Sequence, residues 1–133
     1  AILAGLYCEV INDSKGAHVR PIMIKFLIKA AGIDKIIGIS DACASDGGEG
    51  DINIVNGEIF GSKLTMINAA QNFKNIGLST VDVFKVCSAN PAKAINLNDA
   101  GTIEKGKKAN FVFLSDQMQL KKVFLNGVQV RQF

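Results

Sequence analysis

Cysteine, histidine and long apolar runs are all scarce in this 133-residue chain, and each scarcity excludes a class of protein. The three cysteines, Cys8, Cys43 and Cys87, are odd in number and form no CxxC motif. Such usage is typical of reduced thiols in a cytoplasmic protein, and it argues against a disulfide scaffold or an all-cysteine zinc site. No apolar run reaches the roughly 18 residues of a membrane span, so we expect no membrane association and no signal peptide.

Charge is nearly balanced, because 15 Lys and Arg residues stand against 12 Asp and Glu residues, a net charge of +3. The longest basic stretch, 105–108, is short and has no aromatic neighbours that could stack on bases. We interpret it as a solvated turn and expect no nucleic-acid partner. Hydrophobic residues make up 48% of the chain and charged residues 20%, which predicts a folded protein with a real core.

The first 41 residues have the pattern of a strand, a loop, a helix and a second strand. A strand is predicted at 6–11, followed by turn-forming residues at 12–16. Pro21 suits the first turn of a helix that ends at Gly32, and this helix is too apolar for a surface helix. The apolar run 36–40 is typical of a parallel strand that is buried on both faces. Together these elements predict one βαβ unit.

Two Asn-Gly pairs, at 56–57 and 126–127, predict β-hairpins, since this dipeptide between alternating apolar residues is a strong hairpin signal. The first hairpin would occupy 52–60 and the second 123–130. A further strand is predicted at 111–114, so we expect the tail to form a small β unit.

Helices are predicted between the two hairpins. Ser62 is expected to cap a helix that runs to about residue 75. Ser79 should cap a second helix, which stops before Asn90, and Pro91 should start a short third helix.

Asp41 stands at the carboxyl end of the predicted strand 36–40, where α/β folds keep their catalytic residues. A cap on the following turn is the simpler interpretation of a single Asp at a strand end. Two parallel strands cannot close a barrel, and an open pair would leave bare edges. The residues therefore indicate either that further segments complete the sheet or that the chain pairs with another chain.

Four motifs, in the same order along the chain, resemble the amidohydrolase superfamily. Residues 90–112 resemble its "NPA…G.I..GK.ADLV" signature, with Asn110 in place of the usual Asp. Residues 16–21 resemble a "DGxHVxP" loop, residues 39–42 a "TDA" strand end, and residues 61–66 a "GSxLTM" motif. The last three motifs are similar to those of N-acetylglucosamine-6-phosphate deacetylases, a family within the superfamily.

The resemblance implies an α/β fold, the C-terminal portion of a metal-dependent hydrolase (β/α)8 TIM barrel. Residues 1–100 would be the last βα units of the barrel, and residues 101–133 would be strands of a small β-sandwich. It also implies a cytoplasmic, homodimeric enzyme that removes the acetyl group from a phosphorylated amino sugar, N-acetylglucosamine 6-phosphate.

The resemblance further implies the roles of single residues. Asp41 would be the catalytic carboxylate, which takes a proton from the attacking water and then protonates the leaving amine. The substrate-binding residues would lie in two loops and comprise Gly16, Ala17, His18, Ile59, Phe60 and Gly61. Without the resemblance, His18 is a loop histidine with local hydrogen bonds, and 59–61 is a hairpin strand with its turn.

The implied cofactor is a divalent metal, zinc or iron, in the complete enzyme. A catalytic zinc site needs about three protein ligands, and this chain has one histidine. We therefore expect no metal ligands in this chain, and we expect the 133 residues alone to be inactive.

Two departures from the family pattern concern the substrate loops. Lys15 precedes Gly16 where the family has Asp, unless Ser14 and Lys15 are an insertion and Asp13 fills that place. The segment 41–61 is also shorter than is usual. Because both departures lie in loops that would contact the substrate, the resemblance defines the class of reaction more closely than the identity of the sugar.

Two alternatives stay open. Another amidohydrolase, such as a deaminase or a cyclic amidase, would share the tail signature, although the motifs at 16–21 and 61–66 argue against it. A non-catalytic dimerising module would show Asp41 paired with local donors and no open cleft beside it.

Overall fold

The centre of the molecule is a pair of parallel strands. The computed structural model describes residues 4–44 and 50–133. The segment 46–50, whose three glycines predict irregular structure, lies outside the described residues except for Gly50. Strands β1 (Cys8–Ile11) and β2 (Ile36–Ile39) pair in parallel, with α1 (Pro21–Ala31) between them in sequence. The predicted βαβ unit is therefore confirmed. Three of the four residues of β2 are buried, as a continuous apolar run predicts.

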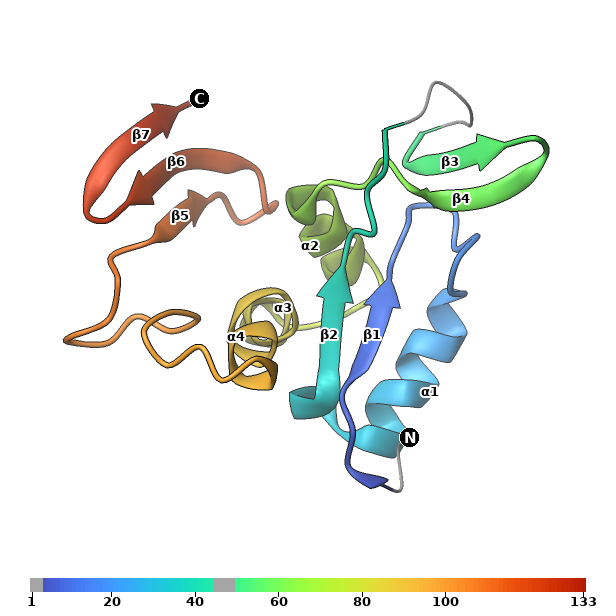
Figure 1. The fold of residues 1–133 in the computed structure, drawn as a ribbon, viewed down its shortest axis with the longest axis horizontal. Helices are drawn as coiled ribbons and strands as arrows, with labels where there is room; N and C mark the ends of the chain where they lie inside the picture. The colour runs from blue at the N-terminus through green and yellow to red at the C-terminus, as the bar shows by residue number, and fades with distance from the viewer. Residues whose placement is uncertain (1–3, 45–49) are drawn as a thin grey trace.

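Helix α1 lies on the β1 side of the pair, and α2, α3 and α4 lie on the β2 side (Figure 1). Pro21 occupies the first turn of α1, and Gly32, with φ of 81°, ends it by donating its N–H to the carbonyl of Ile28. A short 3-10 turn, Ile33–Lys35, leads into β2. The helix packs against the core beside the strands, as its apolar pattern predicts, through Ile24 and the half-buried Leu27 and Ile28. Its inner face buries Ile24, but its other face exposes three apolar side chains by 48% to 67%: Ile22, Met23 and Phe26.

Helix α2 (Met66–Asn75) begins three residues later than predicted, and its cap is Thr65, not Ser62. The Thr65 side chain accepts the N–H of Asn68 at 3.1 Å. Ser62 is the last residue of a strand, and its hydroxyl accepts the N–H of Leu64 and donates to the carbonyl of Ser40. A hydroxyl engaged in this way is not available to cap the helix.

Helices α3 (Thr80–Phe84) and α4 (Asn90–Ala94) form one continuous helical segment through the π-helical residues Lys85–Ala89. Ser79 caps α3 as predicted. The predicted break before Pro91 is wrong, because the wider π-helical turn accommodates the ring and the missing N–H of proline. Within that turn the N–H of Asn90 donates to the carbonyl of Lys85.

Both predicted hairpins are confirmed. Strands β3 (Ile52–Val55) and β4 (Glu58–Ser62) pair antiparallel and lie beyond the carboxyl ends of β1 and β2 (Figure 1). Strands β5 (Phe111–Leu114), β6 (Leu120–Leu125) and β7 (Val128–Gln132) form a separate antiparallel sheet on the side of α2 to α4.

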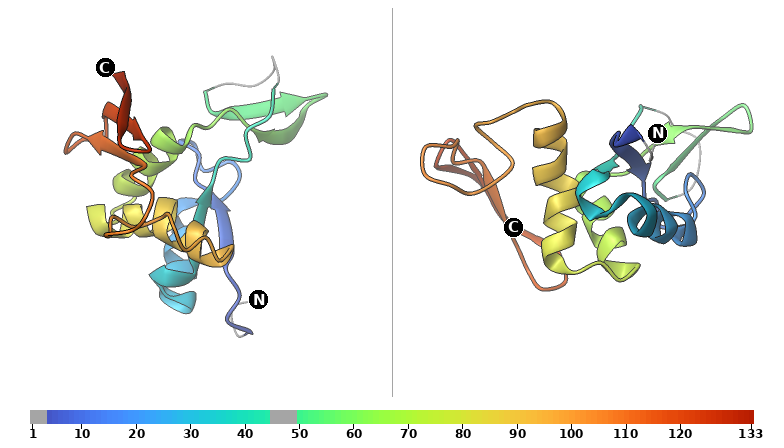
Figure 2. Two further views of the ribbon diagram at one scale, coloured as in Figure 1. Left: turned by 60° about the vertical axis from the view of Figure 1, so that its left-hand side comes forward. Right: turned by 90° about the horizontal axis from the view of Figure 1, so that it is seen from below.

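The core lies between β1, β2 and the helices. Its buried members are Val10, Ile24, Ile36, Ala70, Phe73, Val83, Val86 and Met118. Gly38 of β2 lets Phe73 approach closely, since a Cβ atom there would lie 2.7 Å from the Phe73 ring. Met118 is the exception among these residues, because it belongs to the turn between β5 and β6. The three-stranded sheet otherwise stands to one side of the helices (Figure 2).

Candidate functional site

Three segments that are distant in sequence meet beyond the carboxyl ends of β1 and β2. The ring Nε2 of His18, after β1, lies 3.0 Å from the carbonyl oxygen of Gly61 in β4. The N–H of Ser62 donates to the carbonyl of Asp41, after β2, at 2.8 Å. The N–H of Cys43 donates to the carbonyl of Ser62 at 2.9 Å. The structure therefore brings together His18, Asp41 and Gly61, which the sequence motifs named separately.

Asp13 organises the loop after β1. It is 2% exposed, and its carboxylate accepts the backbone N–H groups of Lys15, Ala17 and His18 at 2.9 to 3.0 Å. The ring Nδ1 of His18 lies 3.0 Å from the same carboxylate. Burial alone would raise the pKa of Asp13, but these hydrogen bonds outweigh it and hold the pKa below its usual value. Asp13 is therefore an ionised acceptor at neutral pH.

Both ring nitrogens of His18 contact protein acceptors. The predicted contact between His18 and the substrate would therefore have to share or replace the carbonyl of Gly61. Gly16 and Ala17 complete the turn, and their N–H groups donate to the carbonyl and the carboxylate of Asp13. Gly16 has a φ of 65°, a conformation that favours glycine.

Asp41 is exposed and has a φ of 48°, in the left-handed region. Its carbonyl is held by Ser62, but its carboxylate makes no hydrogen bond or ion pair with any residue in 4–44 or 50–133. The side chain therefore does not act as a turn cap among the described residues. A carboxylate without local donors also lacks the feature expected of the non-catalytic module.

Gly61 fits against Asp41 because it has no side chain. Its φ is 58°, and a Cβ atom there would lie 2.6 Å from the carbonyl oxygen of Asp41 and 2.8 Å from the sulfur of Cys43. Ile59 and Phe60, the other predicted residues of this strand, have side chains that are 50% and 58% exposed. The position of Asp41 thus depends on the backbone of β4.

Sequence reasoning missed a layer of polar residues beneath these loops. The Nδ2 of Asn53 donates to the carbonyls of Cys43 and Ser62 at 2.8 and 2.9 Å. The carboxylate of Asp51 accepts the N–H and the hydroxyl of Ser14, both at 2.9 Å. Their signal in the sequence is polar residues alternating with apolar ones at the start of β3, where the polar ones are buried.

The donor set of the chain does not fit the metal that the family resemblance implies. Among the residues that the structure describes, no group of three or more His, Cys, Asp or Glu side chains could hold a metal ion. His18 contacts protein acceptors through both nitrogens, so it offers no free lone pair. A three-ligand catalytic metal site would have to draw on ligands outside the described residues.

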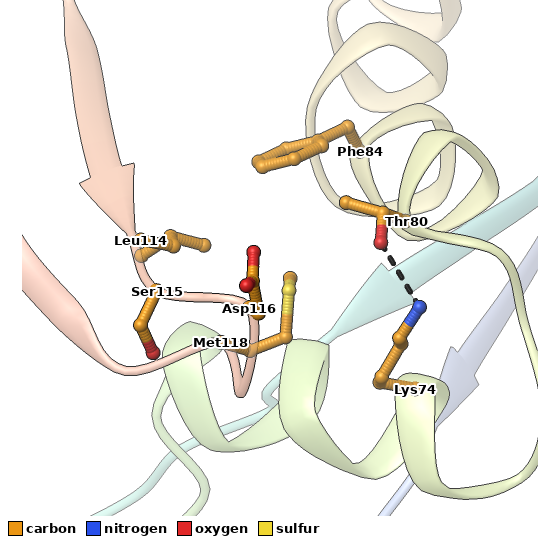
Figure 3. Close-up of a pocket in the computed structure, with 7 residues that line it drawn as sticks. All are labelled: Lys74, Thr80, Phe84, Leu114, Ser115, Asp116 and Met118. Carbon is orange, nitrogen blue, oxygen red and sulfur yellow. Dashed lines mark hydrogen bonds between the residues drawn. The ribbon is translucent and has the colours of Figure 1, made fainter.

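Two cavities lie away from Asp41. One cavity, of about 260 Å³, lies between the helices and the turn that joins β5 and β6 (Figure 3). Two of its lining residues, Lys74 and Thr80, are joined by a hydrogen bond that Lys74 donates. Its lining residues are Lys74, Thr80, Phe84, Leu114, Ser115, Asp116 and Met118. The other, of about 130 Å³, adjoins Asp13 and α2. Neither cavity is lined by a predicted catalytic or substrate-binding residue. No helix in the described part of the chain is long and apolar enough to cross a membrane.

A sequence profile described as the amidohydrolase family matches residues 10–130. The chain belongs to the amidohydrolase family. This confirms the family that the motifs predicted. The amidohydrolase chain is 29% identical to N-acetylgalactosamine-6-phosphate deacetylase of Shewanella sp. (strain ANA-3), covering 91% of itself and 34% of that protein. It is 28% identical to N-acetylglucosamine-6-phosphate deacetylase of Lysinibacillus sphaericus, covering 96% of itself and 35% of that protein.

A solved structure gives the same family resemblance in three dimensions. The chain superimposes on N-acetylglucosamine-6-phosphate deacetylase of Thermotoga maritima with a TM-score of 0.83 and 25% identity. The match covers 98% of this chain and 41% of that structure. The amidohydrolase chain thus spans about a third of the length of the curated relatives it matches, 34% and 35%.

Proposed function

We propose that this chain is part of a deacetylase that hydrolyses the acetamide of N-acetylglucosamine 6-phosphate to glucosamine 6-phosphate and acetate. The observation that carries the proposal is the meeting of three separate motifs at one place. The loop of His18, the strand end at Asp41 and the β4 residue Gly61 are joined by direct contacts. The deacetylases named among the relatives support the same reaction.

In this proposal Asp41 is the catalytic residue. Water attacks the acetyl carbonyl carbon, the C–N bond breaks, and the proton released by the water passes through Asp41 to the amine nitrogen. An exposed carboxylate that has no partner among the described residues is free to carry that proton. A divalent metal, zinc or iron, would be held by ligands outside this chain.

The substrate would lie across the two loops that flank Asp41. Gly16, Ala17 and His18 would face the sugar phosphate, and Ile59, Phe60 and Gly61 would line the acetyl-sugar site through backbone groups. The ring Nε2 of His18, which lies 3.0 Å from the carbonyl oxygen of Gly61, is the group a substrate oxygen would compete for.

The barrel assignment and the two-part division belong to the same proposal. Residues 1–100 would form the last βα units of a (β/α)8 barrel, and residues 101–133 would form strands of a β-sandwich. Support comes from the β1–β2 pair, to which no third described strand is joined. We further propose a cytoplasmic homodimer, with no nucleic-acid or membrane partner.

N-acetylgalactosamine 6-phosphate is the second candidate substrate. It is favoured by the relative from Shewanella, whose name specifies that sugar. The two sugars differ only in the configuration of one hydroxyl, and the shortened segment 41–61 lies in the loops that would contact it.

The test is acetate release by the purified native gene product, supplied with either sugar phosphate. We expect Asp41→Asn to lower kcat by about 10²- to 10⁴-fold with a smaller effect on KM, the usual range for losing a general acid–base group. Asp116→Asn, an exposed carboxylate beside β6, is the matched control and should retain full activity. The 133 residues alone should release no acetate. Absence of release from both sugars by the native gene product, or an active Asp41→Asn variant, would refute the proposal.

A further inference from the structure

We propose that Asp13 is a positioning residue, which holds His18 as a donor through both ring nitrogens and thereby fixes the end of β4 against Asp41. Its catalytic consequence rests on the proposed function. The contacts themselves do not, so the two can be tested separately.

The Asp13 carboxylate makes the first of three linked contacts. It is buried, it accepts three backbone N–H groups of its own loop, and it lies 3.0 Å from Nδ1 of His18. An ionised carboxylate only accepts hydrogen bonds. The contact is therefore a hydrogen bond only if Nδ1 carries a proton and donates it.

The second contact is made by the other ring nitrogen of His18. Nε2 of His18 lies 3.0 Å from the carbonyl oxygen of Gly61, which also only accepts. Both contacts together require a proton on each ring nitrogen, and hence a positively charged ring. The side chain of His18 is 10% exposed and that of Asp13 is fully buried, so each charge is compensated by the other.

The third contact joins the end of β4 to the backbone of Asp41. Gly61 is held by the ring, and the next residue, Ser62, donates its N–H to the carbonyl of Asp41 at 2.8 Å. A Cβ atom on Gly61 would collide with that same carbonyl, so the two backbones are in contact. Any shift of Gly61 is therefore transmitted to the left-handed backbone of Asp41.

The decisive measurement is the ¹⁵N spectrum of the histidine rings in the native gene product at pH 7. The His18 signals are those that disappear in His18→Gln. We expect both of its nitrogens to show the chemical shift of a protonated nitrogen, and we expect Asp13→Asn to remove the proton from one of them. Asp51→Asn is the matched control, because it alters a second buried carboxylate that contacts Ser14 and Asn72 but not His18. It should leave the His18 spectrum unchanged.

Acetate release provides the second readout. A misplaced Asp41 should lower kcat of Asp13→Asn by about 10- to 100-fold, with a smaller change in KM. The backbone amide signal of Ser62 should shift in the same variant, because its acceptor moves.

The outcomes separate the two proposals. An unprotonated Nδ1 or Nε2 in the wild-type spectrum overturns the positioning role without any variant having to fold. So does an Asp13→Asn enzyme with wild-type kcat and an unchanged Ser62 amide signal. A wild-type protein that releases no acetate but shows a doubly protonated His18, with a Ser62 signal that responds to Asp13→Asn, refutes the proposed reaction and supports the positioning contacts.

Discussion

The α/β unit of this protein contains a core of fully buried apolar side chains, whereas no residue of the C-terminal strands β5, β6 and β7 is buried. Phe73 of α2 is fully buried, while Phe113 of β5 is 51% exposed. The rings of Phe111, Phe113 and Phe124 pack on one another at centroid distances of 4.8 to 5.7 Å, and none of the three is fully buried. Local sequence patterning was equally clear in both regions. The difference shows that the sequence pattern determines where strands form, while burial of their apolar side chains requires a second layer of secondary structure packed against the sheet.

Met118 connects the two regions. It belongs to the β5–β6 turn and is 2% exposed within the core of the α/β unit, where Gln71 of α2 donates to its carbonyl at 3.3 Å. A sheet with no buried residue in its strands is therefore attached to the core of the α/β unit through Met118, together with the half-buried Leu114 of β5. Substitutions in the two regions should differ accordingly.

The largest expected effect is that of Phe73→Ala. Removing a fully buried aromatic side chain leaves a cavity against Gly38 and Val86, and it should lower the free energy of unfolding by about 3–5 kcal/mol. Phe113→Ala, the matched change in the C-terminal sheet, should cost about 1 kcal/mol, because half of that side chain already contacts water. Urea unfolding measures both. Equal losses would contradict the contrast between the regions.

Met118→Ala should rank second, at about 2–4 kcal/mol, because it removes a buried side chain from the α/β core. It should also loosen the sheet, so limited proteolysis should cut between α4 and β5 sooner than in the wild type. Met66→Ala is the control, since Met66 is 38% exposed at the start of α2. If proteolysis in that linker is as slow in Met118→Ala as in the control, Met118 is not the anchor.

Gly61→Ala should rank third and tests how β4 supports Asp41. The added Cβ atom would lie 2.6 Å from the carbonyl oxygen of Asp41. The alanine would also have to keep the left-handed φ of 58° that Gly61 adopts. We expect a loss of about 2–3 kcal/mol, the sum of left-handed strain and overpacking. Gly57→Ala, at the tip of the same hairpin, has a φ of 83° and nothing within 4 Å, so it should cost only the strain of about 1 kcal/mol. Thermal unfolding of the pair isolates the steric contact with Asp41.

Most of the secondary structure followed from local signals. The Asn-Gly turns, the apolar run of β2 and the Pro21 and Gly32 boundaries of α1 all act within a few residues, and each was confirmed. The misplaced start of α2 arose where a distant residue competes for the same group. Ser62 has the right chemistry for a helix cap, but its hydroxyl is engaged by Ser40, 22 positions earlier.

The candidate site was predictable as residue types but not as contacts. The motifs pointed to His18, Asp41 and Gly61, yet no pattern in the sequence indicated that the ring of one would bind the carbonyl of another 43 positions away. In the sequence, Asp13 is only a possible match to the Asp of the family loop, displaced by an insertion of Ser14 and Lys15. Its role depends on three backbone N–H groups and one histidine ring nitrogen converging on one carboxylate, which is a property of the folded loop.

The smallest expected effect concerns pH and again sets the two regions apart. Asp13 has a pKa below its usual value in the folded state, so the unfolded chain takes up a proton first as the pH falls. The stability that Asp13 provides is therefore complete at neutral pH and declines as the pH falls below about 4. Asp13→Asn cannot titrate, so its free energy of unfolding should fall less steeply in that range than that of the wild type.

Asp99, in the connection between α4 and β5, supplies the control for this effect. Its ion pair with Lys108 at 2.8 Å lowers the pKa of its carboxyl, but the side chains of Asp99 and Lys108 are 48% and 52% exposed. Water and salt screen an exposed pair of this kind, so Asp99→Asn should retain the wild-type slope. Chemical unfolding of the three proteins between pH 3 and pH 7 makes the comparison. A slope lost in Asp99→Asn and kept in Asp13→Asn would place the acid sensitivity in the C-terminal region instead of the candidate site.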